Sequence, residues 1–515
     1  MNEPIHNNIG AWANANAIAT EPAATVQPPA PDTPATWFAA KHPGLQEIHG
    51  DAVQEFLPVN KQERPSVRDV SEDFLAAVLG EVGSPTAPAV FVAEEDRFYI
   101  YSPAEGIFCE VREPRLEARL SELLLECARA CVRKFDTRNL EFRFRDSSNL
   151  KGVLLRARGL LEVRQDFFET DLMEFVPCSN GMLRVADRVL LPFNPKYRRR
   201  NKLAVPFQAK AKCSLFLNLL LQPALEPADV ELLQRWCGLA LIRVNMAQRM
   251  LLLMGTAGGG KGTLVRVITG IIGQTNVGTL RPDLLGERFE LGRLLGKSLL
   301  YGADVPANFL NCKGASVLKA LTGGDPVTLE FKGSNERPEI ICRFNAIATC
   351  NSRLTVHLEG DAEAWRRRLA IIEFRKSKPE TVVADLSEQI LKTEGPGVLN
   401  WMLEGLDKLR ADGWQLHLTA AQQKLVDDLL HESEADVVFA EECLRKGGTE
   451  SLTVAQCYEA YVNYCTERGW TTMAKKKFST AIADTVTRLH GLTARHDILD
   501  ENGKPQRGWK GLACV

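Results

Sequence analysis

The sequence has no long hydrophobic run, no large net charge and no paired cysteine pattern. None of its 515 residues belongs to an apolar stretch approaching the ~20 residues of a membrane span. Its N-terminus also lacks the basic, apolar and small-residue order of a secretory signal. We therefore expect a cytoplasmic protein with no membrane partner. The formal net charge is −2, so contact with nucleic acid would need local basic patches rather than a global positive field.

The cysteines argue against a secreted disulfide framework. There are 13 of them, and an odd, scattered set fits poorly with such a framework. Cys127 and Cys131 are close in sequence, within a stretch of helical periodicity and with no second Cys or His pair nearby. We interpret them as buried helix residues rather than as zinc ligands.

Composition and periodicity divide the chain into six segments. Residues 1–64 are rich in Ala and Pro, which predicts a disordered arm and linker. The following segments predict a mixed α/β domain, a helical connector, a core of alternating strands and helices, a helical linker, and a terminal unit of two helices followed by strand, turn and strand. Their ranges are 65–205, 206–245, 246–400, 401–434 and 435–515.

The core segment predicts a parallel sheet. Apolar runs of strand length occur at 250–254, 298–303, 340–349 and 369–374, separated by helical or loop segments. Such alternation places helices on the faces of a parallel sheet. Ligands of such sheets bind at the carboxyl ends of the strands.

A glycine-rich loop follows the first apolar run of this core. Glycines allow the backbone to curl so that several N–H groups point at a phosphate. The helix that follows directs its positive end at the same point. The loop therefore predicts ATP binding by nine consecutive residues, which are Gly255, Thr256, Ala257, Gly258, Gly259, Gly260, Lys261, Gly262 and Thr263.

Two side chains of the loop and one beyond it suit phosphate and Mg²⁺. Lys261 brings a positive charge to the β- and γ-phosphates, and the Thr263 hydroxyl is the expected Mg²⁺ ligand. Gly262 occupies the position where Ser or Thr is usual, so the hydroxyl is displaced by one residue. Asp304 ends the next apolar strand and would hold Mg²⁺ through water. An aspartate that only caps a turn is the alternative.

An amide and a group of arginines complete the predicted site. Asn351 follows an apolar strand, where it can hydrogen-bond the γ-phosphate or the lytic water. Arg366, Arg367 and Arg368 precede the last strand of the core. They suit an arginine finger, whose planar cation neutralises charge on the γ-phosphate. A solvated edge of the sheet is the alternative.

With these motifs in this order, the chain resembles the superfamily-three helicases, specifically the phage and plasmid primase-helicase group related to poxvirus primase-helicases. The resemblance is strongest between residues 175 and 375. The motifs that carry it are Asn180-Gly181-Met182-Leu183, the loop at 255–263, Arg288-Phe289-Glu290-Leu291, Leu321 to Asp325, Asn351, and Trp365 to Phe374.

The resemblance implies an α/β fold with an AAA+-like P-loop ATPase core, a mixed α/β domain before it and a winged-helix DNA-binding domain after it. Lys261, Asp304 and Asn351 match the family's nucleotide motifs. One of Arg367 or Arg368 matches the finger donated to a neighbouring subunit, which implies a ring, usually a hexamer. Ala303 stands where many relatives have a carboxylate, so the catalytic base stays unassigned.

The resemblance also implies contacts with DNA. The hairpin between Leu329 and Ile340 resembles the loop that lines the pore of the ring. Its cations Lys332 and Arg337 are therefore candidates to hold a phosphate backbone. The candidates in the terminal unit are Lys475, Lys476, Lys477, Lys504 and Arg507. A solvated charged surface is the alternative for these residues.

These features predict an ATP- and Mg²⁺-dependent ring helicase that translocates on single-stranded DNA and unwinds fork duplex during replication of a phage, plasmid or other mobile element. Upstream of residue 175 the sequence has neither a zinc-ribbon spacing nor an acidic polymerase triad, so a separate primase or initiator would supply priming. One alternative is an origin-binding or DNA-sensing ring that uses ATP mainly as an assembly switch. The other is a nucleotide kinase, suggested by Gly-Lys-Gly-Thr.

Overall fold

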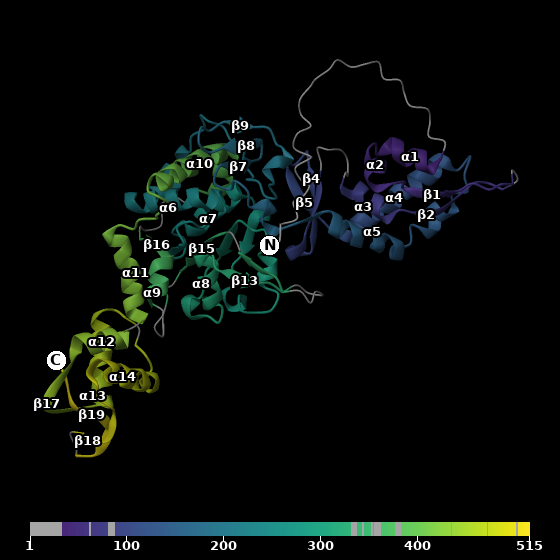
Figure 1. Cartoon of the computed structure of the whole chain (residues 1–515). Helices are drawn as coiled ribbons and strands as arrows, with labels where there is room; N and C mark the ends of the chain where they lie inside the picture. Colours follow the sequence, from purple (N-terminus) through teal and green to yellow (C-terminus); the bar gives the residue numbers. More distant parts are fainter. Residues whose placement is uncertain are drawn as a thin grey trace, which may run out of the picture. The chain divides into compact units, whose positions relative to one another are not determined.

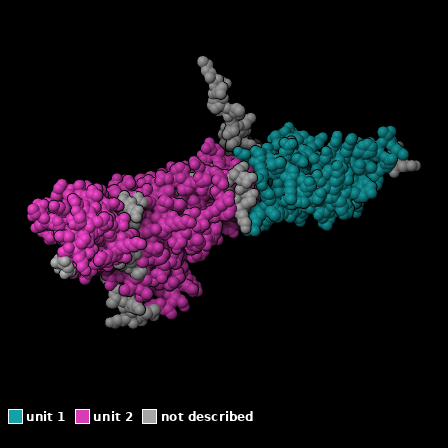
Figure 2. Space-filling model, turned by 90° about the horizontal axis from the view of Figure 1, so that it is seen from below, with its two compact units in different colours: residues 1–82, 111–162 teal, residues 83–110, 163–515 magenta. Residues whose placement is uncertain are grey.

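The computed structural model describes residues 33–60, 63–80, 88–330, 337–341, 344–351, 354, 362–375, 383–433, 435–470, 472–500 and 503–515 (Figure 1). The chain forms two compact units, one of residues 1–82 and 111–162, the other of residues 83–110 and 163–515 (Figure 2). Among the described residues, no helix is long and apolar enough to cross a membrane. The fold is mixed α/β with a parallel sheet, as predicted. The limits of the last five predicted segments stay a prediction.

The first unit is mainly helical. Its helices are α1 (Pro34–Lys41), α2 (Leu45–His49), α3 (Glu72–Gly80), α4 (Glu113–Cys131) and α5 (Ser147–Leu160). Its two strands, β1 (Val53–Phe56) and β2 (Ser66–Val70), pair antiparallel.

Three of these elements, α1, α2 and β1, correct the prediction that residues 1–64 form only an arm and linker. The Thr33 side chain caps α1, and Pro34 occupies its first turn, where a missing N–H costs no hydrogen bond. Phe38 is fully buried and its ring packs edge-on against Phe74 of α3. Tertiary burial thus stabilises a short helix that composition alone does not indicate.

The second unit begins with two small sheets. The first has the order β5-β4-β3-β6, from β3 (Ala89–Val92), β4 (Arg97–Ser102), β5 (Ile107–Val111) and β6 (Glu162–Val163). The second has the order β7-β8-β9, from β7 (Phe175–Cys178), β8 (Gly181–Arg184) and β9 (Leu190–Leu191). A π-helical segment, Phe216–Leu221, and the helix α6 (Pro227–Leu241) then lead into the core.

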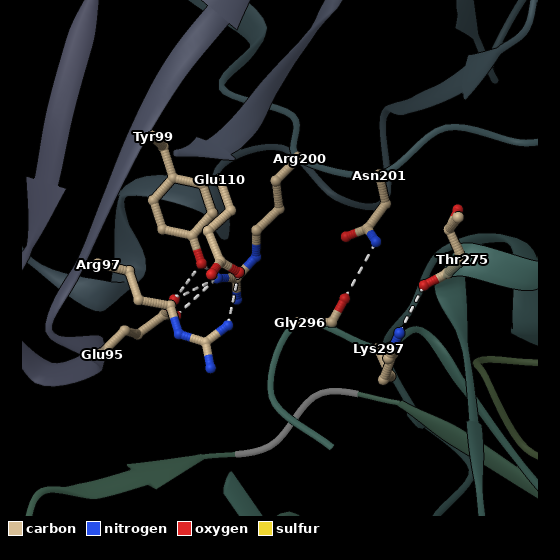
Figure 3. A network of polar contacts seen from close by, with 9 residues as sticks. All are labelled: Glu95, Arg97, Tyr99, Glu110, Arg200, Asn201, Thr275, Gly296 and Lys297. Atoms are coloured by element: carbon tan, nitrogen blue, oxygen red, sulfur yellow. Dashed lines mark hydrogen bonds and ion pairs between the residues drawn. The ribbon is translucent and has the colours of Figure 1, made fainter. Parts of the chain in front are cut away.

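A buried polar network holds the first of these sheets against the residues that lead into the core (Figure 3). The Arg200 guanidinium lies 2.6 Å from the Glu95 carboxylate, and the exposed fractions of the two side chains are 5% and 0%. The Tyr99 hydroxyl donates a 2.6 Å hydrogen bond to Glu95. Asn201 then donates a 3.0 Å hydrogen bond to the Gly296 carbonyl, inside the core. These charges are buried and paired, which is the condition for tolerating them there.

The core contains a five-stranded parallel sheet with the order β11-β12-β15-β10-β16. The strands are β10 (Met250–Gly255), β11 (Val277–Thr279), β12 (Leu299–Gly302), β15 (Asn345–Cys350) and β16 (Leu369–Phe374). The helices α6, α7 (Lys261–Ile272) and α10 (Leu386–Ala411) pack on one face. The helices α8 (Ala315–Gly323), α9 (Ala362–Arg368) and α11 (Ala420–Ser433) pack on the other. Strands covered on both faces read as continuous apolar runs, which is why the sequence located four of them. The short edge strand β11 was not predicted.

One predicted strand is divided in the structure. The apolar run at 340–349 contributes to two elements. β14 (Glu339–Ile341) pairs antiparallel with β13 (Pro326–Thr328) in a separate ribbon, whereas β15 begins at Asn345 inside the parallel sheet. Ile341 is 44% exposed and Asn345 is fully buried. Periodicity does not place this break because both parts are apolar in sequence.

The C-terminal segment has its own core. Its elements are α12 (Ala435–Cys443), β17 (Leu444–Thr453), α13 (Val454–Glu467), α14 (Lys475–His490), β18 (Arg495–Leu499) and β19 (Pro505–Cys514). The strands form an antiparallel sheet with the order β17-β19-β18. Tyr461, Phe478 and Trp509 are fully buried in this core. The two helices followed by strand, turn and strand agree with the prediction. β17 was not predicted, because few of its residues are buried.

Candidate nucleotide site

The glycine-rich loop joins β10 to α7 and has the predicted curled backbone. Gly255, Gly258 and Gly260 have φ angles of 140°, 83° and 98°, a region that favours glycine. A Cβ atom at position 255 would also lie 2.6 Å from the Phe374 carbonyl oxygen. These glycines are required by the backbone. Gly262 is not, because a Cβ atom there would meet only the end of the Arg266 side chain, at 3.6 Å.

Lys261 is held inside the curl of this loop. It begins α7, is 5% exposed, and donates hydrogen bonds to the carbonyls of Gly255 (2.7 Å) and Thr256 (2.8 Å). Burial lowers the pKa of its ammonium group, while Cys350 and Asp304 act in the opposite direction. The structure therefore places a cation where backbone N–H groups and a helix N-terminus also converge.

Asp304 and Asn351 lie together at the carboxyl ends of neighbouring strands. The Asn351 side-chain amide donates a 2.8 Å hydrogen bond to the Asp304 carboxylate. The Asp304 backbone N–H donates a 3.0 Å hydrogen bond to the Thr349 hydroxyl. Asp304 has a φ of 44°, an uncommon conformation for a residue with a side chain, and such strain is concentrated at functional sites. Asp304 follows β12, Asn351 follows β15, and the glycine-rich loop follows β10. Because β15 lies between β12 and β10 in the sheet, Asp304 and Asn351 adjoin the loop.

Oxygen atoms suited to Mg²⁺ occur at this edge. The Thr263 hydroxyl, in the first turn of α7, accepts a 3.2 Å hydrogen bond from Arg266. The Asp304 carboxylate is exposed. Within the described ranges no group of three or more His, Cys, Asp or Glu side chains forms a metal cluster. A few oxygen donors fit Mg²⁺, which is bound by one or two carboxylates together with substrate phosphates and water.

The three arginines lie at the amino ends of the parallel strands, opposite to the carboxyl ends that carry the glycine-rich loop. They precede β16, which runs from Leu369 to Phe374 beside β10. At about 3.3 Å per residue, one length of β16 puts them roughly 20 Å from its carboxyl end. The structure therefore does not bring Arg367 or Arg368 together with the glycine-rich loop of the same chain.

The arginines also differ from one another. Arg366 is paired with Glu363 and Asp427, and Arg368 donates 3.1 Å hydrogen bonds to the carbonyls of Lys319 and Ala364. Arg367 is exposed and has no hydrogen bond or ion pair within the part of the chain that the structure describes. Of the three arginines, Arg367 is therefore the one whose guanidinium makes no hydrogen bond or ion pair with the described residues.

Two pockets lie at the opposite ends of the parallel strands. The arginine pocket, of about 480 Å³, lies at the amino end and includes Arg249, Arg367, Arg368 and His417. The loop pocket, of about 340 Å³, lies at the carboxyl end. It is lined by Met254, Gly255, Thr256, Asn351, Ile371, Glu373, Leu425, Asp428 and Leu429. Neither Glu373 nor Asp428 was predicted as a site residue. Glu373 lies within the motif from Trp365 to Phe374 but was interpreted only as part of an apolar strand, and no motif marks the helix that carries Asp428.

The predicted DNA-binding residues that the structure describes are exposed, except for the half-buried Arg507, and they are not gathered in one place. Lys332 lies outside the described residues. Arg337 is 3.4 Å from Glu330, an acidic residue that also pairs with Arg288. The remaining candidates belong to the C-terminal segment, with three lysines in the first turn of α14 and two cations near the turn between β18 and β19, namely Lys475, Lys476, Lys477, Lys504 and Arg507.

Two family models match the chain. One, described as D5 N terminal like, matches residues 95–222. The predicted resemblance to the primase-helicase group is confirmed. The other, a family of unknown function named DUF5906, matches residues 253–368, from β10 through the glycine-rich loop to α9. No curated protein matches the sequence.

Solved structures show weaker likenesses. Two apo structures of the NrS-1 C-terminal region are 13% identical, with TM-scores of 0.47 and 0.48, and each match covers 85% of this chain and 99% of the other. A JCV helicase structure with a bound small molecule is 18% identical over 40% of this chain and 61% of the other, with a TM-score of 0.22.

Proposed function

We propose that this protein is an ATP-hydrolysing, hexameric DNA helicase that translocates on single-stranded DNA during replication of a mobile element. The D5 N-terminal-like match supports a replication-associated helicase or primase role. The more specific proposal, an ATP-hydrolysing ring, rests on one observation. Arg367 is separated from the glycine-rich loop by one length of β16. A loop and a free arginine at opposite edges of one sheet suit an ATP site shared between two copies of the chain.

The first half of that site is the loop with its neighbours. Lys261 would contact the β- and γ-phosphates, and Asn351, already bonded to Asp304, would contact the γ-phosphate or the attacking water. Thr263 and Asp304 would hold Mg²⁺, which neutralises negative charge on the phosphates. The sheet order places β10 between the strand of Asn351 and the strand after the arginines, which supports an AAA+-like P-loop core.

The second half is the arginine pocket of the next copy. An extended arginine side chain cannot span one strand length, so Arg367 would act on the nucleotide of its neighbour. Arg368 would position α9, because its guanidinium is bonded to backbone carbonyls. This division of roles narrows the two finger candidates to Arg367.

The C-terminal segment would bind DNA as a winged-helix domain. Cations in the first turn of a helix are unfavourable, because they adjoin the positive end of the helix dipole. The lysines at 475–477 therefore do not stabilise α14, whereas a DNA phosphate there would be attracted by both the lysines and the helix N-terminus. Arg507 of β19 donates a 3.2 Å hydrogen bond to Ser479 of α14, so a cation of the proposed wing lies beside that helix.

A second candidate function is a ring that uses ATP mainly as an assembly switch. The observation that favours it is Ala303, which leaves Asp304 without a neighbouring carboxylate. Turnover of ATP with and without single-stranded DNA, measured beside strand displacement on a tailed duplex and particle mass, separates the two. DNA-stimulated turnover with displacement supports the helicase. Slow turnover, nucleotide-dependent assembly and no displacement support the switch.

A further inference from the structure

The proposed ATP site still lacks a group that takes the proton of the attacking water. Asp304 accepts a hydrogen bond from Asn351 and is assigned to Mg²⁺ in the proposed function, on which this inference rests. Its neighbours Ala303 and Val305 have no acidic group. Any further carboxylate at this edge must come from another element.

The loop pocket contains two carboxylates that were not predicted as site residues. Glu373 of β16 is engaged by Arg375, whose guanidinium donates a 2.6 Å hydrogen bond to it. Asp428 of α11 is half-buried and has no hydrogen bond or ion pair to any residue that the structure describes. A carboxylate paired with a guanidinium is the weaker proton acceptor of the two, so Asp428 is better suited to act as a base.

The helix that carries Asp428 is fixed on both sides. Arg366 donates a 2.9 Å hydrogen bond to Asp427, and Gln422 donates a 2.8 Å hydrogen bond to Asp229 of α6. The apolar side chains of α11 are buried against the sheet. Leu425, Asp428 and Leu429 share one face of the helix, since residues three and four apart are neighbours there, and all three line the loop pocket.

We propose that Asp428 is the general base of ATP hydrolysis. Asp428 lines the same pocket as Asn351 and the first two residues of the loop. Asp428 takes one proton from a water molecule as the water oxygen bonds to the γ-phosphorus. The bond from that phosphorus to the bridging oxygen breaks, and its electron pair leaves with ADP. Inorganic phosphate is the second product, and Asp428 returns its proton to solvent.

The test compares three substitutions in the full chain. Asp428→Asn keeps the shape of the side chain and removes its basicity, so kcat should fall by about 10²- to 10⁴-fold. Affinity for a non-hydrolysable ATP analogue, measured by calorimetry, should stay within about twofold of the unmodified protein, because a base contributes to the chemical step rather than to ground-state binding. Asp428→Glu should recover part of the rate. Glu373→Gln, the comparison within the same pocket, should lower kcat by at most about tenfold.

Chemical rescue distinguishes a base from a residue that only supports α11. Formate added to Asp428→Ala should restore turnover, whereas chloride at the same ionic strength should not. An unchanged kcat in Asp428→Asn, a loss explained by ATP affinity, or an absence of formate rescue would overturn the assignment. Lys261→Ala, measured in parallel, tests the proposed function separately. If this variant keeps its ATP turnover, the assignment of the glycine-rich loop as the nucleotide site is wrong.

Discussion

Gly262 is the residue at which the loop departs from the usual phosphate-binding pattern, and the structure gives no steric reason for it. A serine there would meet only the flexible end of Arg266. We expect Gly262→Ser to stabilise the first turn of α7 by about 0.5 kcal/mol, since serine is the better helix former. The new hydroxyl should also lower the Mg²⁺ concentration needed for half-maximal ATP turnover. Thermal unfolding and a Mg²⁺ titration of turnover measure the two effects.

Gly255→Ala is the contrasting substitution in the same loop. Position 255 has a φ of 140°, and an added Cβ atom would lie 2.6 Å from a backbone oxygen. This variant should lose stability by roughly 1–3 kcal/mol, because backbone strain adds to the close contact. Equal behaviour of the two variants would contradict the distinction between a glycine that the backbone requires and one that it does not.

At the scale of elements, the network of Figure 3 ties β4 and its hairpin to the approach to the core. Glu95→Gln would leave the Arg200 charge buried without its partner, so we expect a loss of about 3–5 kcal/mol in the free energy of unfolding. The midpoint of urea unfolding measures the change. Glu110→Gln is the matched control, because Glu110 pairs with Arg97 at a partly exposed position. Exposed pairs contribute at most about 1 kcal/mol. Similar losses in both variants would contradict the burial argument.

The lysines in the first turn of α14 allow a test of the proposed DNA contact. Replacing Lys475, Lys476 and Lys477 by Gln should weaken binding of the full chain to DNA and reduce the salt dependence of binding, because fewer phosphates are neutralised. The same change should leave stability unchanged or slightly higher, since it removes cations from the positive end of a helix dipole. Fluorescence anisotropy at several salt concentrations measures binding. An unchanged salt slope would assign these lysines to a solvated surface.

How far the sequence predicts the elements depends on what stabilises each one. β10, the loop and α7 were predicted because a doubly buried strand, required glycines and an amphipathic helix all leave local patterns. The helix α1 was not predicted, because contact between Phe38 and Phe74 stabilises it. The motifs likewise include Asp304 and Asn351, which directly follow apolar strands, but not Asp428. Its place beside the loop depends on the packing of α11 across the sheet, which no local pattern encodes.

At the scale of the whole molecule, the proposed site requires two copies of the chain, and this gives a test that one copy cannot satisfy. Lys261→Ala should abolish turnover by disabling the loop half of each site. Arg367→Ala should bind ATP but hydrolyse it at least about 10³-fold more slowly, the effect expected of an arginine finger. Arg368→Ala is the comparison: it should lose stability by about 1–3 kcal/mol, because the carbonyls of Lys319 and Ala364 lose their donor.

Mixing the two inactive variants then decides whether the site is shared. In a mixed ring, a chain with Arg367→Ala keeps an intact loop and meets an intact arginine wherever its neighbour carries Lys261→Ala. ATP turnover should therefore reappear when the variants are assembled together, and it should be greatest near equal amounts of the two. If both halves of the site belonged to one chain, every chain in the mixture would be defective and turnover would stay absent at all ratios. Recovered turnover would assign Arg367 to the neighbouring nucleotide, whereas its absence in rings shown by mass to be mixed would overturn the shared site.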